Sequence, residues 1–542
     1  MRRLFILPLA LLLLVTLPGR AFAHGLGRSQ DLPLPFWLYL FAAAAVLLVS
    51  FVQIVLFVDD RHTLYRYPRF NLLRFGPLRA VLTNGPFLLG LRALSVALFL
   101  LVVLCGLLGR QGPGYNFAPT FVWIIWWVGL GFFTAFVGNV WRLVNPWKVL
   151  FEWAEGLARR LGASKGLELG EPYPARLGVW PALVLYAVFI WIENNFTGSA
   201  VPLNIALLTL LYSLLTWTGM VVFGKDVWLQ RGEAFSVLYG IIARFAPTEV
   251  RVKDPGTCQD CGGDCQPAEG GCVNCYGCFA RAAPEDRELN LRPPAIGLLS
   301  AGRITYDRVV FVVFVLASVT YDSALGTPPA VALQRITSMP QVLGLVALPL
   351  FFLVVYLAFV KLSQLFSGGC VPFGRFAAEY VYSIVPIAIA YQVAHYYTYL
   401  FIQGQAIIAL VSDPFGWGWD LFGTADHQVN AALIGADTVW YTQVALIVAG
   451  HVVAVYLAHV IALRLLGDTK LAARSQYPML GLMILYTVFS LWILSQPIVE
   501  ESRNEANLES APPEPTPTTT QTAPLQPIRQ PPMPDPSNPG AP

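Results

Sequence analysis

PFWLYLFAAAAVLLVSFVQIVLFV, residues 35–58, decides the fold class. It has no charged residue and is longer than the roughly 20 mostly apolar residues that a helix needs to cross a bilayer. Further stretches of the same kind follow along the chain. With this first one they lie near 35–58, 87–108, 119–141, 177–194, 202–223, 308–325, 343–366, 380–403, 439–465 and 477–496. The sequence therefore predicts an all-α, polytopic transmembrane helical bundle of about ten spans.

The composition agrees with a membrane protein whose main partner is the lipid bilayer. The chain has 542 residues, of which 56% are hydrophobic and 12% charged, whereas soluble domains average about 25% charged residues. The net charge of +3 does not indicate an acidic partner such as nucleic acid.

The first 23 residues have the pattern of a secretory signal peptide. Arg2 and Arg3 precede an apolar run over 4–17, and Ala-Phe-Ala at 21–23 matches a cleavage site between small residues. Cleavage would leave His24 as the mature N-terminus. The alternative is an uncleaved first helix, but the separate apolar run that begins at Pro35 favours cleavage.

The distribution of basic residues predicts the orientation. Arginine and lysine concentrate in the loops 59–86, 142–176 and 224–307, whereas the alternate loops hold little beyond Arg110 and Arg335. By the positive-inside rule the former loops face the cytoplasm, so both mature termini lie outside the cytoplasmic membrane. The predicted parts are a signal peptide (1–23), spans one to five with an interfacial helix (24–245), a cytoplasmic Cys-rich loop (246–300), spans six to ten (301–499) and a disordered outer tail (500–542).

CQDCGGDCQPAEGGCVNCYGC, residues 258–278, is a candidate metal site. In the reducing cytoplasm clustered cysteines favour a metal over disulfides. Two C-x2-C pairs thirteen residues apart are close to structural zinc spacing, which makes zinc the leading candidate. The last three cysteines also match part of a ferredoxin pattern, so an iron–sulfur cluster is the alternative; a redox-active or solvated loop is the third interpretation. The candidate ligands are Cys258, Cys261, Cys265, Cys272, Cys275 and Cys278.

Three histidines fall within predicted spans, where an ionisable residue is costly and marks function by default. His395 lies in the eighth span, and His451 and His459 lie eight residues apart in the ninth. Histidines on neighbouring helices can bind haem iron or copper, or relay protons. The alternative is that each only donates or accepts a hydrogen bond between helices.

Acidic residues gather near the predicted outer ends of the spans. Glu193 and Asp322 lie at span ends, and the outer loop 412–430 contains Asp413. Together with Asp420, Asp426 and His427 of the same loop they could line a vestibule for a cation, or they could be ordinary solvated helix ends. His24 is a further candidate, because an N-terminal histidine can bind copper through its amine and imidazole.

Two segments are predicted to lie beside the spans. GNVWRLVNPWK (138–148) contains Pro146 and two tryptophans, a pattern that predicts a helix break and an interfacial helix. Residues 224–247 mix charged and apolar residues at helical spacing. They predict an amphipathic helix that either lies on the inner membrane face, with Trp228 at the interface, or packs under the bundle.

Several motifs resemble one family of bacterial polytopic membrane proteins. They cover most of the chain from His24 to about Tyr486 and include VGNVWRLVNPWK, FGKDVWLQRGEAFSVLYGIIARFAP, TYDSALGTP, VAHYYTYLFIQGQ, SDPFGWGWDLFGT and GHVVAVYLAHVIAL. Members are often labelled fenitrothion hydrolase, which implies organophosphate hydrolysis. The family positions are His24, Asp322, His395, Asp413, His451 and His459, without assigned roles. Unlike this chain, family members pass from the ARFAP helix to the LRPP segment without a cysteine cluster.

The sequence leaves three functions open. The first is transport of a metal ion or small solute through the histidines and outer acids. The second is a membrane redox protein with haem or copper at His395 and His451. The third is the hydrolase that the resemblance implies. The sequence contains no P-loop, H-E-x-x-H, G-x-S-x-G or Rossmann motif.

Overall fold

The computed structural model describes residues 34–58, 67–162, 166–258, 266–268, 271–299, 304–336 and 340–496. The chain divides into two units, Met1–Val499 and Glu500–Pro542, and all described residues belong to the first. The predictions for the signal peptide, His24, Cys261, Cys265 and the tail 500–542 fall outside the described residues.

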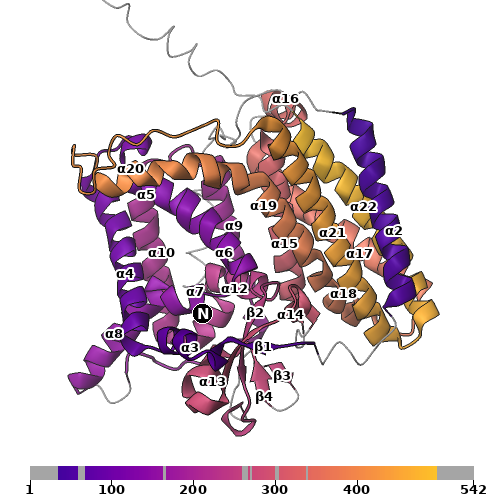
Figure 1. The fold of residues 1–542 in the computed structure, drawn as a ribbon, viewed down its shortest axis with the longest axis horizontal. Coiled ribbons are helices and arrows are strands. Elements are labelled where there is room, and N and C mark those ends of the chain that lie inside the picture. The colour runs from indigo at the N-terminus through magenta and orange to yellow at the C-terminus, as the bar shows by residue number, and fades with distance from the viewer. Residues whose placement is uncertain are drawn as a thin grey trace, which may run out of the picture. The chain divides into compact units, whose positions relative to one another are not determined.

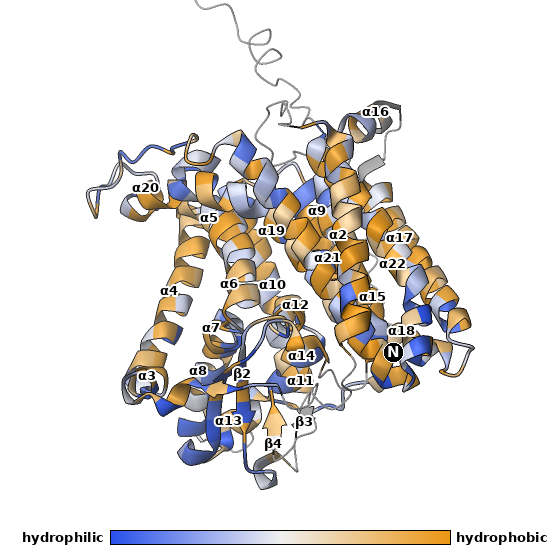
Figure 2. Ribbon diagram, turned by 45° about the vertical axis from the view of Figure 1, so that its right-hand side comes forward, coloured by the Kyte–Doolittle hydropathy of each residue, from blue (hydrophilic) through white to orange (hydrophobic). Residues whose placement is uncertain are grey.

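The predicted helical bundle is confirmed. Among the described residues, ten helical segments are long and apolar enough to cross a membrane. Their apolar surfaces run along the bundle in Figure 2, and polar residues gather at its ends. Seven consist of one long helix: α2 (Phe36–Phe57), α4 (Gly85–Leu108), α10 (Pro202–Phe223), α15 (Tyr306–Leu325), α17 (Pro340–Phe366), α21 (Ala436–Leu466) and α22 (Thr469–Ser495). An eighth, Ala175–Asn195, is mainly α9 (Trp180–Asn195).

The remaining two spans are interrupted. The third, residues 117–136, contains α5 (Phe117–Thr120), a π-helical segment η3 (Phe121–Gly129) and α6 (Leu130–Phe136). The eighth, residues 373–412, contains α18 (Phe373–Tyr380), η7 (Val381–Ile384), α19 (Val385–Ile402), η8 (Gln403–Gln405) and α20 (Ala406–Ser412). Pro386 lies in the first turn of α19, where its missing N–H costs no helical hydrogen bond. π-Helical segments are rare and occur frequently at functional sites.

A small sheet forms at the end of the bundle away from α20 (Figure 1). This sheet was not predicted from the sequence. Its strands are β1 (Phe70–Asn71), β2 (Thr248–Val252), β3 (Gln266–Ala268), β4 (Gly271–Val273) and β5 (Arg287–Leu291), in the order β1-β5-β2-β4-β3 with antiparallel pairing. The fully buried Glu249 joins the sheet, accepting hydrogen bonds from Tyr67 (2.6 Å), Arg69 (2.7 Å) and Arg292 (2.9 Å). The sheet and α13 (Tyr276–Arg281) hold the cysteines, and we call residues 248–291 the cysteine module.

The two segments predicted beside the spans are short helices. Asn145 caps α8 (Pro146–Arg160) by accepting from the amide of Lys148, which gives the predicted break at Pro146. Residues 224–247 form α11 (Lys225–Arg231) and α12 (Ala234–Ile242). Trp228 is only 9% exposed. A Cβ on Gly219 or Gly232 would come within 2.3 Å of its ring, so this segment packs under the bundle.

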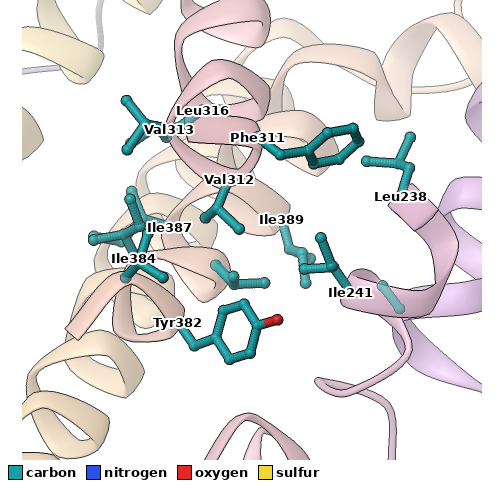
Figure 3. Packing of buried hydrophobic residues seen from close by; sticks show 14 of the residues in the cluster. Leu238, Ile241, Phe311, Val312, Val313, Leu316, Tyr382, Ile384, Ile387 and Ile389 are labelled. Carbon is teal, nitrogen blue, oxygen red and sulfur yellow. The ribbon is translucent and has the colours of Figure 1, made fainter. Parts of the chain in front are cut away.

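Helix α12 lies against the middle of the bundle. Figure 3 shows its Leu238 beside Phe311 of α15 and its Ile241 beside Ile389 of α19. All but Gly240 and Ile242 on the stretch 237–242 are buried. This contact brings the short helix next to the spans that carry the polar residues described below.

Candidate functional site

Two buried carboxylates meet at one tyrosine inside the bundle. The hydroxyl of Tyr396, on α19, lies 2.5 Å from Oδ2 of Asp322 and 3.1 Å from Oε1 of Glu193. Glu193 is in the last turn of α9 and Asp322 in the last turn of α15, and both are at least nine-tenths buried. A phenol has one proton to donate. The Tyr396 hydroxyl can therefore donate fully to only one carboxylate. Both contacts become hydrogen bonds when the other carboxyl group carries a proton and donates it to the Tyr396 oxygen.

His395 and Trp127 extend this arrangement at its two ends. His395 Nε2 lies 2.8 Å from Oδ2 of Asp322, and its side chain is 15% exposed. Trp127, in the π-helical segment η3, donates to Oε1 of Glu193 at 2.7 Å. The other oxygen of Glu193, Oε2, is buried and has no hydrogen-bond partner among the described residues. We call Trp127, Glu193, Tyr396, Asp322 and His395 the carboxylate network.

Helix ends bring these residues together. Three consecutive polar residues, Glu193, Asn194 and Asn195, are buried in the last turn of α9, although the last turn of a helix more often faces solvent. Tyr321, the neighbour of Asp322, donates to Oδ1 of Asn195 at 2.9 Å. The ends of α9 and α15 are thus joined by two adjacent polar contacts in the bundle interior.

A mainly apolar cavity adjoins the network. It encloses about 680 Å³, including its open mouth, and Trp127, Tyr186, Val319 and Gln392 are among its lining residues. Trp127 both lines this cavity and donates to Glu193. A molecule in the cavity that contacts Trp127 would therefore be separated from the Glu193 carboxylate by this one side chain.

The other two membrane histidines lie in separate surroundings. His451 is fully buried. Its Nδ1 lies 2.8 Å from the carbonyl of Ile447, and its Nε2 has no hydrogen-bond partner among the described residues. His459 Nε2 lies 3.1 Å from the carbonyl of Val58, and its Nδ1 lies 3.0 Å from the amide of Gln476. His459 thus links α21 to the end of α2 and to α22, which is the structural role of an interhelical hydrogen bond.

The acidic residues predicted to line a vestibule differ in their burial and in their hydrogen bonds. Glu193 and Asp322 are buried rather than solvated. Asp413 instead closes a turn after α20, where its carboxylate accepts from the amides of Trp417 (2.9 Å) and Gly418 (2.6 Å). Asp420, Asp426 and His427 are exposed along the following loop.

Three of the four described cysteines of the module converge. The Sγ atoms of Cys258, Cys272 and Cys278 lie within 4.8 Å of one another, and Cys272 and Cys278 are buried. Cys258 and Cys272 form a disulfide in this structure. Cys275 caps α13, with its sulfur 3.5 Å from the amide of Cys278. When reduced, three converging thiolates with a nearby fourth match the donor set that zinc prefers.

Sequence reasoning missed Tyr396 and Trp127. Both stand in aromatic-rich stretches, AHYYTYL and IIWWVG, where their apolar rings are typical of any transmembrane helix. The only signal for Tyr396 was its position beside His395. Without the helix packing, nothing in the sequence distinguishes its hydroxyl from those of Tyr397 and Tyr399.

Comparisons with protein-family models, with curated proteins and with solved structures found no match.

Proposed function

We propose that the protein is a multi-pass transporter of a small solute or ion, and that the carboxylate network couples transport to protons. The observation that supports this is the shared contact of Tyr396 with two buried carboxylates, Asp322 and Glu193. Ionisable residues inside a membrane are costly, and in transporters they form proton relays. The exposed edge of His395 offers such a relay a route to water.

The interrupted spans support the same proposal. Transporters commonly build their sites near breaks in transmembrane helices, where backbone and side chains line a cavity. Trp127 belongs to the π-helical segment of the third span, and His395 and Tyr396 belong to the interrupted eighth span. Both interrupted spans therefore contribute side chains to one network, Trp127 from within the irregular segment itself and His395 and Tyr396 from the regular helix α19.

The test reconstitutes the protein into proteoliposomes, imposes a pH gradient across their membrane and measures the electrical current that each added solute produces. The panel comprises divalent metal ions, organic cations and organic anions. We expect at least one class to give a current, and we expect Glu193→Gln to lower it about tenfold or more, because the amide cannot exchange a proton. Asp426→Asn makes the same change on an exposed loop and should leave the current unchanged. Equal currents in the two variants, or no solute-dependent current, would contradict the proposal.

We further propose that the cysteine module holds a structural metal ion, with zinc favoured and an iron–sulfur cluster as the alternative. The convergence of Cys258, Cys272 and Cys278 supports it. Protein purified under reducing conditions should contain one equivalent of metal, and Cys278→Ser should lose most of it. Cys370→Ser, at an exposed cysteine outside the module, should not. Colourless zinc-loaded protein favours zinc, whereas a broad blue-violet absorption favours iron–sulfur.

A membrane redox protein is the second candidate, and one observation favours it. The buried Nε2 of His451 has no described partner and is available to a haem iron or copper ion. Purified protein with this function should show a haem absorption band or bound copper that His451→Ala removes. Absence of both would leave transport as the only candidate with support.

A further inference from the structure

A second cavity, distinct from the one beside the network, lies between the cysteine module and the bundle. It encloses about 720 Å³, including its open mouth. Three arginines from different parts of the chain line it: Arg142 of α7 (Trp141–Val144), Arg244 just after α12 and Arg308 of α15. No carboxylate is among the described lining residues. We call this cavity the arginine pocket.

Two donor atoms of this pocket are buried and have no acceptor among the described residues. Arg244 is only 9% exposed, and its Nη1 is buried without a hydrogen-bond partner among the described residues. Nδ2 of Asn274 is in the same situation. Leaving such donors unpaired is unfavourable, most of all for a charged group. A bound anion would supply the missing acceptors.

The protein holds these donors in place. Asn274 has a positive φ of 58°, and its backbone N–H donates to the carbonyl of Val250 in β2 at 2.8 Å. The guanidinium of Arg244 lies 5.4 Å from the ring centre of Tyr382, and that of Arg142 lies 5.3 Å from the ring centre of Tyr276. Burial raises the pKa of Tyr276, which keeps its hydroxyl protonated.

Three acids close to these arginines in the chain are occupied elsewhere. Glu249, five residues after Arg244, accepts from Tyr67, Arg69 and Arg292. Glu233 precedes α12 and accepts from the amides of Phe235 (2.9 Å) and Ser236 (2.8 Å). Asp307 precedes Arg308 and accepts from the amide of Val179 at 2.5 Å. None of these three carboxylates lines the pocket.

The arginine pocket shares a wall with the apolar cavity. Ile241 of α12 lines both. Other residues of the same helix divide between them, with Ser236 and Gly240 on the arginine pocket and Leu238 and Ile242 on the apolar cavity. Ile241 therefore stands between the two spaces, and a ligand that spans both passes this side chain, with a charged head among the arginines and an apolar part in the bundle.

We propose that the arginine pocket binds the oxyanion head of an amphipathic organic phosphate whose apolar part occupies the adjoining cavity. Guanidinium groups recognise phosphate through paired, charge-assisted hydrogen bonds. The binding itself does not depend on transport; only the role of this ligand as the transported solute rests on the proposed function. The shared chemistry fits either a soluble alkyl phosphate or the headgroup of an anionic lipid.

Calorimetry on the full chain in nanodiscs of zwitterionic lipid tests the proposal, with hexyl phosphate as the probe. We expect it to bind about tenfold or more tightly than inorganic phosphate, because its chain buries apolar surface. Arg244→Gln and the half-buried Arg142→Gln should each weaken hexyl phosphate binding about tenfold. Two positions keep the test usable if one variant does not fold. Unchanged affinity in both folded variants, or equal binding of hexyltrimethylammonium, would overturn the proposal.

The apolar part of the proposal has its own test. A Cβ on Gly131, which lines the apolar cavity, would meet no atom within 4 Å, so a side chain can start there, and Gly131→Leu should occupy part of that cavity. It should abolish the advantage of hexyl phosphate over inorganic phosphate. Gly156→Leu is the control, since Gly156 also has open space around it but lies on α8 outside both cavities. A hexyl advantage that survives Gly131→Leu would overturn the two-cavity ligand.

Two further experiments distinguish a lipid from a soluble molecule as the natural ligand and separate this inference from the transport proposal. Adding phosphatidic acid to the nanodiscs should displace hexyl phosphate if a lipid headgroup is the natural ligand; undiminished binding identifies a soluble molecule. Glu193→Gln, which should stop transport, should leave hexyl phosphate binding unchanged. Binding without transport therefore refutes only the transport proposal, and transport without binding refutes only this inference.

Discussion

Tyr396 determines whether Glu193 and Asp322 act as one unit or as two. Its hydroxyl contacts both carboxylates, at 3.1 Å from Glu193 and 2.5 Å from Asp322. Because groups in such close contact share their protons, the two acids should titrate together rather than separately. That coupling would let a single proton move between α9 and α15 through α19.

We therefore expect Tyr396→Phe to uncouple the two acids while the bundle stays folded. The ring and its packing remain, but the hydroxyl that bridges Glu193 and Asp322 is lost. Solute-driven current should fall about tenfold, and the pH at which the current is half-maximal should move. Tyr397→Phe is the matched control, because the Tyr397 hydroxyl donates to the carbonyl of Val439 outside the network. Identical pH profiles for Tyr396→Phe and the unaltered protein would contradict the bridging role.

At the residue scale, the sequence revealed the costly groups but not their partners. His395, Asp322 and Glu193 stood out because ionisable residues are rare in apolar spans. His451 and His459 stood out for the same reason, yet the structure places them in other contacts. Which of these residues meet depends on how the helices rotate and cross, and that is set by packing between residues far apart in the chain.

At the scale of elements, the cysteine module combines a small apolar cluster with ion pairs around one buried carboxylate. Glu288 of β5 has a side chain only 8% exposed, beside Arg251 (3.4 Å) and Lys253 (3.2 Å). Burial acts to raise the pKa of Glu288, but hydrogen bonds from Asn290 and Lys253 and the charges of Lys253 and Arg251 outweigh it, so the pKa falls below its ordinary value of 4.5.

The sheet should therefore loosen in acid. A carboxyl whose pKa is lowered on folding stabilises the folded state above its unfolded pKa, and this contribution disappears as the pH falls through the folded value. We expect amide exchange in β2 and β5, corrected for the intrinsic rate, to increase below about pH 4.5. Glu288→Gln should remove this pH dependence, and Glu285→Gln, at an exposed neighbour, should keep it. The same acid response in both variants would exclude Glu288 as its origin.

The module is also where sequence reasoning captured the least. The spacing of the cysteines indicated a metal-binding segment, but it did not indicate the sheet around them. Two of the paired strands, β1 and β5, are more than two hundred residues apart in the sequence. Strands of two to five residues carry too few positions for an alternating pattern. The existence of the ten spans, by contrast, was predicted correctly, because apolar length alone specifies a transmembrane helix. Most of the predicted ends are close to those in the structure, but the eighth span runs over Phe373–Ser412 instead of the predicted 380–403, and the tenth begins at Thr469 instead of 477.

At the scale of the whole molecule, the orientation in the membrane remains a prediction from basic residues. The sheet and the start of α15 lie at one end of the bundle, and α20 lies at the other (Figure 1). The loops that carry most arginine and lysine connect to the sheet end, so the positive-inside rule places the cysteine module and the arginine pocket in the cytoplasm. Organic phosphates of the cytoplasm and anionic lipids of the inner leaflet would both have access to the pocket there.

Cys370 allows this orientation to be tested directly. It is exposed and belongs to the connection from α17 to α18. The start of α18 lies toward the same end of the bundle as the sheet in Figure 1. A membrane-impermeant maleimide added to intact cells should therefore leave Cys370 unlabelled, and peptide mapping should find the label only after the membrane is permeabilised. Asp426→Cys, on the exposed loop after α20, should react in intact cells. The reverse pattern would place the cysteine module outside, where oxidising conditions would favour its disulfide over a metal site.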